Sequence, residues 1–496
     1  MLLRTKLLLF AVSSFLIGCA STFDVLHDSP ANSEQLEQVI RHHISDTTFN
    51  HAHWGIHIEN LSTGRTIFLK NEKRMFVPAS NVKIPTTAAA YLELGPDFQF
   101  ETRLYTDGEI RDSVLYGNLY VRSNGDPSLY TRLYDDHSEI FYDWARYLKA
   151  LGIHEIKGNI VADASAFDEE RIGFGWSHSG LDVWYSAPVG PLQWNENALD
   201  LVIIPPGSTN ESAQIFLQKP TAFVTILDQT VISDTSATRI RVNRTYGTNE
   251  IVISGTIQAG ADTLYRYPSI FNPELFYATV LTEHFEDAGI AVSVFPVAIT
   301  DTTLVSEIRE EALVLHTHFS PRLHELLKVL MKDSQNLYAE TIPRVMAYQQ
   351  NGFGTFDEGA KIVEAWLDSM GIAPESYRYR DGSGLSRFNL FSPSQFVTML
   401  SYMYAHDLRD YWLESFPTAG VDGTLRLRMR GSSAENNVRA KTGTLSHKRG
   451  LSGYVQSASG DVYAFSFVIN GYLTTASETD RITDSILAVI AAYEGH

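Results

Sequence analysis

Cysteine and positive charge are both scarce in this chain. Its 496 residues include a single cysteine, Cys19, so no disulfide can form within the chain. Lys and Arg number 39 against 58 Asp and Glu, and the formal net charge at pH 7 is −19. Because there is no global positive field to neutralise phosphates, we expect neither nucleic acid nor anionic lipid as the main partner. A local basic site remains compatible with this charge.

Long apolar runs are also absent after the N-terminus, so we expect no membrane-spanning helix there. The run from Leu7 to Gly18 is itself too short to span a bilayer, and Arg4 and Lys6 precede it. A short apolar run after basic residues is typical of a secretion signal, which we predict over residues 1–18. The rest of the protein is then expected outside the cytoplasm.

The end of this signal, LIGC from Leu16 to Cys19, resembles the bacterial lipobox. The resemblance implies that Cys19 is lipidated, becomes the mature N-terminus and attaches the protein to a bacterial membrane. Ala20 in the second position favours the outer membrane if the source is Gram-negative. Residues 19–33 are polar and contain Pro and Ser, which predicts a tether. The alternative is a plain signal peptide with an incidental cysteine.

The spacing of apolar residues divides the remaining chain into three parts, as its length leads us to expect. Helical and strand signals alternate at the start, and helical spacing returns after about residue 306. Between these parts, short alternating runs separated by Gly, Asn and Asp predict β-rich material, interrupted by one helix over NPELFYATVLTEHFEDAG. This order indicates an α/β (α+β) domain split by an insertion, with both halves in one antiparallel sheet flanked by helices.

The predicted domain limits follow from these changes of pattern. Residues 34–98 and 306–496 form the split domain. Residues 99–185 and 255–305 form an inserted domain II, and residues 186–254 form an inserted β domain III.

A serine and a lysine stand three residues apart in PASNVKIPTT, at the start of an alanine-rich helix. They are Ser80 and Lys83, and residues i and i+3 share a helix face, so the hydroxyl and the amine can meet. A serine is a poor nucleophile unless a base removes its proton. A lysine can be that base when burial or nearby cations lower its pKa. Alone, the spacing also fits a capping serine followed by a solvated lysine.

Two later motifs favour catalysis. KDSQN contains Ser334 and Asn336 at a helical stretch, and VRAKTGT contains Lys441 on a predicted strand. S-x-x-K, S-x-N and K-T-G in this order form the signature of serine acyl-transferases that react with penicillin. The joint occurrence of three motifs in fitting contexts is far less frequent by chance than any one of them.

The polar residues of the three motifs can divide the steps of acyl transfer. Lys83 would remove the proton of Ser80, and Ser334 would relay a proton to the leaving amine. Asn336 would fix the Lys83 ammonium and a substrate amide carbonyl. Lys441 would depress the pKa of Lys83 as a second cation and attract a substrate carboxylate.

The residues after Lys441 are candidates for substrate binding. Thr442 and Thr444 would donate hydrogen bonds to that carboxylate, and Gly443 would let the substrate lie close to the strand. The backbone N–H groups of Ser80 and Thr444 would hold the tetrahedral oxyanion.

On these motifs the chain resembles the low-molecular-mass penicillin-binding proteins, in particular the D-alanyl-D-alanine carboxypeptidase/endopeptidase type whose transpeptidase-like domain is split by inserted domains. The likeness runs from about residue 34 to the C-terminus. It includes the stretches LGPDFQF, GNLYVRSNGDPSL, IKGNIVADASAFD, DGSGLSR at 381–387 and AGVDGTL at 419–425. We expect DGSGLSR to shape a loop near the site rather than to carry a nucleophile.

The resemblance implies the penicillin-recognising fold that is shared with transpeptidases and β-lactamases. It implies a periplasmic or cell-surface serine peptidase that acts on peptidoglycan stem peptides through an acyl-enzyme on Ser80. β-Lactam antibiotics would be covalent inhibitors, and no cofactor or metal would be used. The choice between carboxypeptidase and endopeptidase activity stays open. Because all three motifs lie outside the insertion, we expect it to supply neither the nucleophile nor the base.

Two residues fit the pattern less simply. Pro85 removes a helix hydrogen bond two residues after Lys83, which suits a position of Ser80 at the first turn. Gln335 stands in the second motif where Asp is commoner, a change that we expect to be chemically minor.

Two other functions are weighed against this one. A β-lactamase would share Ser80 and Lys83 but needs a residue that activates water for deacylation. The one matching string, ENALD from Glu196 to Asp200, lies in the predicted insertion. A non-enzymatic cell-wall or penicillin-sensing protein would be favoured by degraded motif residues, and these are intact. None of the 16 histidines lies in an H-E-x-x-H motif or a Cys/His cluster, so we expect no metal site.

Overall fold

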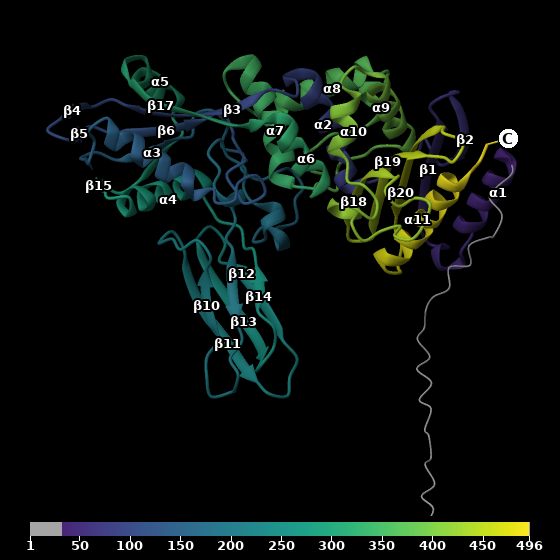
Figure 1. Ribbon diagram of the computed structural model, residues 1–496, viewed down its shortest axis with the longest axis horizontal. Coiled ribbons are helices and arrows are strands. Elements are labelled where there is room, and N and C mark those ends of the chain that lie inside the picture. The colour runs from purple at the N-terminus through teal and green to yellow at the C-terminus, as the bar shows by residue number, and fades with distance from the viewer. Residues whose placement is uncertain (1–31, 496) are drawn as a thin grey trace, which may run out of the picture.

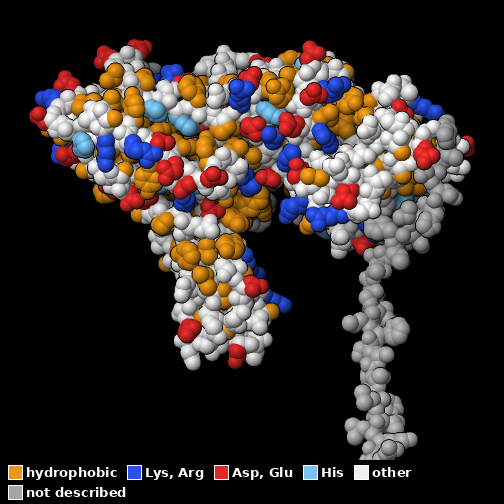
Figure 2. Space-filling model, viewed as in Figure 1, with side chains coloured by type: hydrophobic (Ala, Val, Ile, Leu, Met, Phe, Trp, Pro, Cys, Tyr) orange, Lys and Arg blue, Asp and Glu red, His pale blue; other side chains and the backbone are white. Residues whose placement is uncertain are grey.

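The computed structural model describes residues 32–495, so the predictions for the signal peptide and Cys19 lie outside the described residues. Figure 1 shows a long body from which one β-rich lobe projects. Figure 2 shows acidic and basic side chains mixed over the body, with Lys and Arg side chains beside the projecting lobe. Within residues 32–495, no helix combines the length and the apolar character that crossing a bilayer requires.

A five-stranded antiparallel sheet forms the centre of one end of the body, in the order β18-β19-β20-β1-β2. Its strands are β1 His53–Asn60, β2 Arg65–Lys70, β18 Arg439–Leu445, β19 Lys448–Gln456 and β20 Val462–Asn470. β1 pairs with β20 along its full length, from His53 opposite Asn470 to Asn60 opposite Tyr463. The prediction that both halves of the split domain share one sheet is confirmed.

Helices cover both faces of this sheet, as predicted (Figure 1). One face carries α1 Ser33–Ile44 and α11 Ala476–Ala492. The other side holds α2 Lys83–Leu94, α6 Leu323–Lys332, α7 Asn336–Asn351, α8 Phe356–Ser369, α9 Pro393–Ala405 and α10 Arg409–Ser415. Along β20, Phe465 and Phe467 join the core with α11, whereas Ala464 and Val468 join the core with α9. Alternate residues of a strand point to opposite faces, so one strand serves both cores.

The inserted residues form the other end of the body around a second five-stranded sheet, in the order β16-β8-β6-β3-β17. Its strands are β3 Gln99–Thr106, β6 Leu119–Ser123, β8 Ile160–Asp163, β16 Val297–Ile299 and β17 Leu313–Arg322. A small sheet beside it contains β4 Glu109–Arg111, β5 Val114–Tyr116, β7 Glu155–Ile156 and β15 Ala291–Val292. The helices of this region are α3 Ser138–Ala150, α4 Pro273–Asp287 and α5 Thr302–Glu311.

The expectation of a single helix in the insertion is wrong. α4 covers the predicted stretch, but α3 within the insertion is a helix as well. In α3 the buried residues Phe141, Trp144 and Leu148 recur at helical spacing and form one core with α4. The helical period of α3 was therefore present in the sequence, between the strand signals on either side.

The projecting lobe contains two three-stranded sheets, β10-β9-β14 and β11-β13-β12. Its strands are β9 Leu201–Ile204, β10 Gln214–Leu217, β11 Thr225–Ser233, β12 Arg239–Arg244, β13 Glu250–Gln258 and β14 Leu264–Arg266. β13 runs across the predicted limit between residues 254 and 255, and β17 pairs with β3 although it lies after residue 305. The division into numbered domains stays a prediction.

Candidate active site

Ser80 lies in a 3-10 turn, η2 Ala79–Val82, that leads directly into α2. Ala79 has φ 51°, a left-handed conformation that residues with a Cβ rarely adopt. Pro85 is the third residue of α2, where an N–H group has no partner inside the helix. The proline is therefore compatible with a helix that begins at the Ser80 turn, as expected.

Lys83 is the centre of a hydrogen-bond network that joins three segments. Its Nζ lies 3.1 Å from Ser80 Oγ, 2.6 Å from Asn336 Oδ1 and 2.7 Å from the backbone oxygen of Ser383. The Asn336 and Ser383 oxygens can only accept hydrogen bonds, so each accepts one from an N–H group of the amine. In the neutral amine, the lone pair is then left to face Ser80 Oγ, which is the arrangement that a general base requires.

Burial is what prepares Lys83 to be neutral. The side chain is fully buried, and burial lowers its pKa to about 7, while the charges of Asp381 and Glu340 work in the opposite direction. Burial, one of the two causes expected from the sequence, is therefore the larger cause of this shift. The charges of Lys83 and Lys441 oppose each other, and burial and then the charge of Lys83 hold the pKa of Lys441 well below its usual value.

Lys441 forms a hydrogen bond with Ser334, the second serine of the site. Its Nζ donates to Ser334 Oγ at 2.9 Å and to the backbone oxygen of Thr442 at 3.0 Å. Both lysines are fully buried, while Ser80 and Ser334 are only partly buried. The five predicted catalytic residues therefore form two hydrogen-bonded groups, which are Ser80, Lys83 and Asn336 in one and Ser334 and Lys441 in the other. The charge of Lys83 also lowers the pKa of Lys441.

The structure gives a reason for glycine at position 443 in addition to the one expected from the sequence. A Cβ at this position would lie 2.6 Å from the backbone oxygen of Pro78 and 3.2 Å from the nitrogen of Ser80. Contacts this short exclude a side chain, so the glycine lets β18 pack against the Ser80 turn itself.

The hydroxyls of Thr442 and Thr444 differ in exposure. Thr442 is buried and donates to Thr424 Oγ1 at 2.9 Å. Thr444 is exposed, and its hydroxyl accepts a hydrogen bond from Arg449 on β19. The guanidinium of Arg449 also contacts Asp480 Oδ1 at 2.8 Å. Sequence reasoning missed Arg449, although the two-residue turn between β18 and β19 places it opposite Thr444.

The DGSGLSR stretch forms a buried loop against Lys83, as expected of a loop near the site. Ser383 is fully buried, accepts from Lys83 through its backbone oxygen and donates its N–H to Glu340 Oε1 at 2.8 Å. Asp381 accepts from the Gly384 N–H at 2.8 Å, so the loop is closed on itself. The three-motif signature does not include this contribution.

The insertion also reaches the site, which the sequence did not indicate. Asn336 Nδ2 donates to the backbone oxygen of Tyr185 at 2.7 Å, and Trp176 Nε1 donates to Asp381 at 2.9 Å. One N–H of the Asn336 amide is therefore occupied by the insertion rather than free for a substrate carbonyl. Neither contact supplies a nucleophile or a base.

Glu196, the acidic residue of ENALD, lies beside the second motif, and both oxygens of its carboxylate have hydrogen-bond partners in the protein. One carboxylate oxygen accepts from Arg132 Nε at 2.6 Å, and the other accepts from Gln335 Nε2. Burial raises the pKa of Glu196 to about 7, while Arg132 works against that shift. Because both oxygens have protein partners, the structure offers no water-activating carboxylate of the β-lactamase kind at Glu196.

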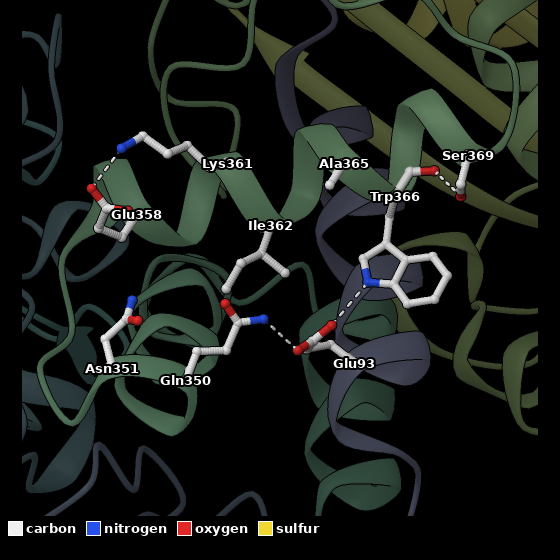
Figure 3. Close-up of a pocket in the computed structure, with 9 residues that line it drawn as sticks. All are labelled: Glu93, Gln350, Asn351, Glu358, Lys361, Ile362, Ala365, Trp366 and Ser369. Carbon is white, nitrogen blue, oxygen red and sulfur yellow. Dashed lines mark hydrogen bonds and ion pairs between the residues drawn. The ribbon is translucent and has the colours of Figure 1, made fainter.

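A pocket of about 460 Å³ lies elsewhere, between α2, α7 and α8 (Figure 3). Its carboxylate Glu93 already accepts from Gln350 at 2.7 Å and from Trp366 at 3.1 Å. None of the motif residues lines it. Within residues 32–495, no group of three or more His, Cys, Asp and Glu side chains is arranged to hold a metal ion.

Comparison with known proteins identifies the class. Residues 36–493 match the model of the D-Ala-D-Ala carboxypeptidase 3 (S13) family. The chain is 30% identical over 487 residues to a D-alanyl-D-alanine carboxypeptidase of Actinomadura sp. (strain R39), covering 94% of this chain and 86% of the relative. It is 29% identical over 426 residues to the D-alanyl-D-alanine carboxypeptidase DacB of Haemophilus influenzae, covering 85% and 86%.

Solved structures agree with these relatives. The fold matches the crystal structure of penicillin binding protein 4 from H. influenzae with a TM-score of 0.77 and 26% identity, over 90% of this chain and 97% of that one. A structure of the same protein with a novel β-lactam matches with a TM-score of 0.70 and 25% identity, over 88% and 95%.

The chain therefore belongs to the D-Ala-D-Ala carboxypeptidase 3 (S13) family. The expected penicillin-recognising fold and the expected serine DD-peptidase activity are confirmed. The β-lactamase alternative is less well supported by these relatives and by the engaged carboxylate of Glu196.

Proposed function

We propose that this hydrolase cleaves the D-Ala-D-Ala bond of peptidoglycan stem peptides with Ser80 as the nucleophile and Lys83 as the base. Neutral Lys83 takes the Ser80 proton while Ser80 Oγ bonds to the carbonyl carbon. The C–N bond then breaks, the terminal D-Ala leaves, and an ester on Ser80 remains. Lys83 then loses its proton to solvent and is neutral again. It takes a proton from the water that attacks the ester, the C–O bond to Ser80 breaks, and Ser80 Oγ regains a proton from Lys83. The 3.1 Å contact between Lys83 Nζ and Ser80 Oγ is the observation that carries this proposal.

The leaving amine needs a proton, which we assign to Ser334. Its hydroxyl accepts from Lys441 Nζ at 2.9 Å, so Lys441 in its ammonium form can replace the proton that Ser334 gives away and then regain one from solvent. Asn336 keeps Lys83 in place through its oxygen. Proton transfer therefore uses two lysine–serine pairs. Lys83 and Ser80 act on the carbonyl side of the scissile bond, and Lys441 and Ser334 act on the amine side.

The oxyanion and the terminal carboxylate are assigned to β18. The close packing of Gly443 on the Ser80 nitrogen supports an oxyanion hole made by the N–H groups of Ser80 and Thr444. The carboxylate is assigned to the exposed hydroxyl of Thr444, with Arg449 adding a positive charge beside it. The hydroxyl of Thr442, which was also expected to bind the carboxylate, donates its one proton to Thr424 Oγ1.

We expect purified enzyme to shorten pentapeptide stems by one D-Ala, and mass spectrometry of muropeptides checks this. Loss of one residue from monomeric stems reports carboxypeptidase activity, while splitting of cross-linked dimers reports endopeptidase activity. Ser80→Ala serves as the control, and it should leave both substrates intact. An enzyme that changes neither substrate but still binds penicillin would favour the non-enzymatic sensing function instead.

We further propose that Cys19 carries a lipid anchor and that the enzyme works at the bacterial cell surface or in the periplasm, at the outer membrane if the source is Gram-negative. The LIGC sequence supports this. In Cys19→Ser we expect no fatty-acid incorporation and release of the protein into the soluble fraction, since the anchor supplies membrane affinity. Radiolabelled palmitate and membrane fractionation measure both. Unchanged partition of Cys19→Ser into membranes would contradict the anchor.

A further inference from the structure

Ser334 has a backbone conformation that residues with a side chain adopt only when their surroundings enforce it. Its φ is 61°, in the left-handed region. The residue stands in the short turn between α6, which ends at Lys332, and α7, which begins at Asn336. Ser334 must nevertheless keep its hydroxyl 2.9 Å from Lys441 Nζ. Contacts that hold this turn are therefore relevant to the reaction.

One ion pair of the insertion contacts both neighbours of Ser334. Arg132 donates to Asp333 Oδ2 at 3.0 Å through Nη1 and to Glu196 Oε1 at 2.6 Å through Nε. The second carboxylate oxygen of Glu196 accepts from Gln335 Nε2. Asp333 and Gln335 are the residues on either side of Ser334. Arg132 therefore contacts the turn on one side of Ser334, and Glu196 contacts it on the other side.

Glu196 is itself fixed by its local backbone. It lies in η5 Asn195–Asn197, where all three residues have positive φ. The Asn195 N–H donates to the backbone oxygen of Leu129 at 2.9 Å, which ties η5 to the segment that carries Arg132. The Glu196 side chain is 6% exposed, and a buried carboxylate is retained only with good partners.

We propose that Arg132 and Glu196 are positioning residues that hold the Ser334 turn in its catalytic conformation. This rests on the proposed role of Ser334 as the proton relay. It gives the insertion a task in the reaction, because both residues come from the inserted part of the chain. It also gives a reason for Gln335, since a second-motif aspartate would bring a like charge toward the Glu196 carboxylate, whereas the amide donates to it. Under this proposal, Gln335 has a larger role than the minor one expected from the sequence.

The test exchanges the amide of Gln335 and the carboxylate of Glu196. Gln335→Glu places two carboxylates together, and we expect kcat for a D-Ala-D-Ala peptide to fall roughly tenfold or more with little change in KM. Adding Glu196→Gln restores one amide and one carboxylate, so the double variant should recover to within about threefold of the parent. A residue that only stabilises the fold would not produce a loss confined to kcat that the exchange reverses.

Two further variants separate positioning from stability. Gln193 is buried in the insertion and donates to Thr341 Oγ1 on α7 at 2.9 Å, away from the Ser334 turn. Gln193→Glu therefore buries a similar charge and should lower Tm without lowering kcat per folded enzyme. Asp333 is 40% exposed in its side chain, so Asp333→Asn should fold normally and still lower kcat by about threefold through its lost contact with Arg132.

Ser334→Ala distinguishes the failure of this inference from the failure of the mechanism. If Ser334→Ala keeps the parent kcat, the proton relay and the positioning role are both overturned. If Ser334→Ala loses activity while Gln335→Glu and Asp333→Asn keep it, only the positioning role is overturned. A double variant that stays as slow as Gln335→Glu, or a kcat loss in Gln193→Glu as large as in Gln335→Glu, also overturns it.

Discussion

Lys83→Arg is expected to slow acylation of the enzyme by a β-lactam by roughly a thousandfold or more. Arginine keeps the positive charge but stays protonated at any useful pH, so it cannot accept the Ser80 proton. The buried amine of Lys83, with its pKa lowered to about 7, can accept it. The rate of labelling by a fluorescent penicillin measures the effect.

The pH dependence of the same rate gives a second readout. In the parent enzyme, acylation should rise as the pH passes through about 7, because Lys83 loses its proton there. Lys83→Arg should lack this rise. Lys361→Arg, an exposed lysine paired with Glu358 on α8, is the matched control and should behave as the parent does. A variant Lys83→Arg that keeps a tenth of the parent rate, or its pH profile, would contradict the role of Lys83 as base.

The second large effect is a difference between substrates. We expect the enzyme to hydrolyse a D-Ala-D-Ala peptide at least a thousandfold faster than it turns over nitrocefin, a difference of about 4 kcal/mol in barrier height. After peptide cleavage, D-Ala departs and water can reach the ester. The ring-opened amine of a β-lactam stays attached, blocks that position and keeps Ser334 from exchanging its proton.

Glu196 is the residue on which this prediction depends in the structure. Each oxygen of its carboxylate accepts a hydrogen bond from the protein, one from Arg132 and the other from Gln335, so we expect it not to activate water for deacylation. Steady-state assays of both substrates, made side by side, measure the ratio. Rapid and continuous nitrocefin hydrolysis that disappears in Glu196→Gln would show that the protein is a β-lactamase.

The central sheet and the reacting groups could be predicted because each has a local sequence signal. The near-continuous apolar residues of β20 mark a strand buried on both faces, and the turn signal STGR marks the end of β1. The S-x-x-K spacing marks one helix turn. The three motifs come from different parts of the chain, but their shared chemistry indicates that they meet. The structure brings them together through Lys83 and Lys441.

The surroundings of the site could not be predicted because they depend on tertiary packing. Nothing near Lys83 in the sequence indicates that the backbone oxygen of Ser383 binds it across 300 positions. The same holds for Tyr185 at Asn336, since the contact uses backbone atoms that every residue has. The extent of burial, which is the first cause of the low Lys83 pKa, also depends on packing and cannot be read from the charges along the chain.

The most direct test of the account is to find where penicillin binds covalently. The purified protein is incubated with penicillin, digested and analysed by peptide mapping with mass spectrometry, with Ser80→Ala treated in parallel. We predict one adduct, located on Ser80 within the peptide from Met75 to Lys83, and no adduct in Ser80→Ala. An adduct on another residue of the parent, or labelling that persists in Ser80→Ala, would contradict the central claim that Ser80 is the nucleophile.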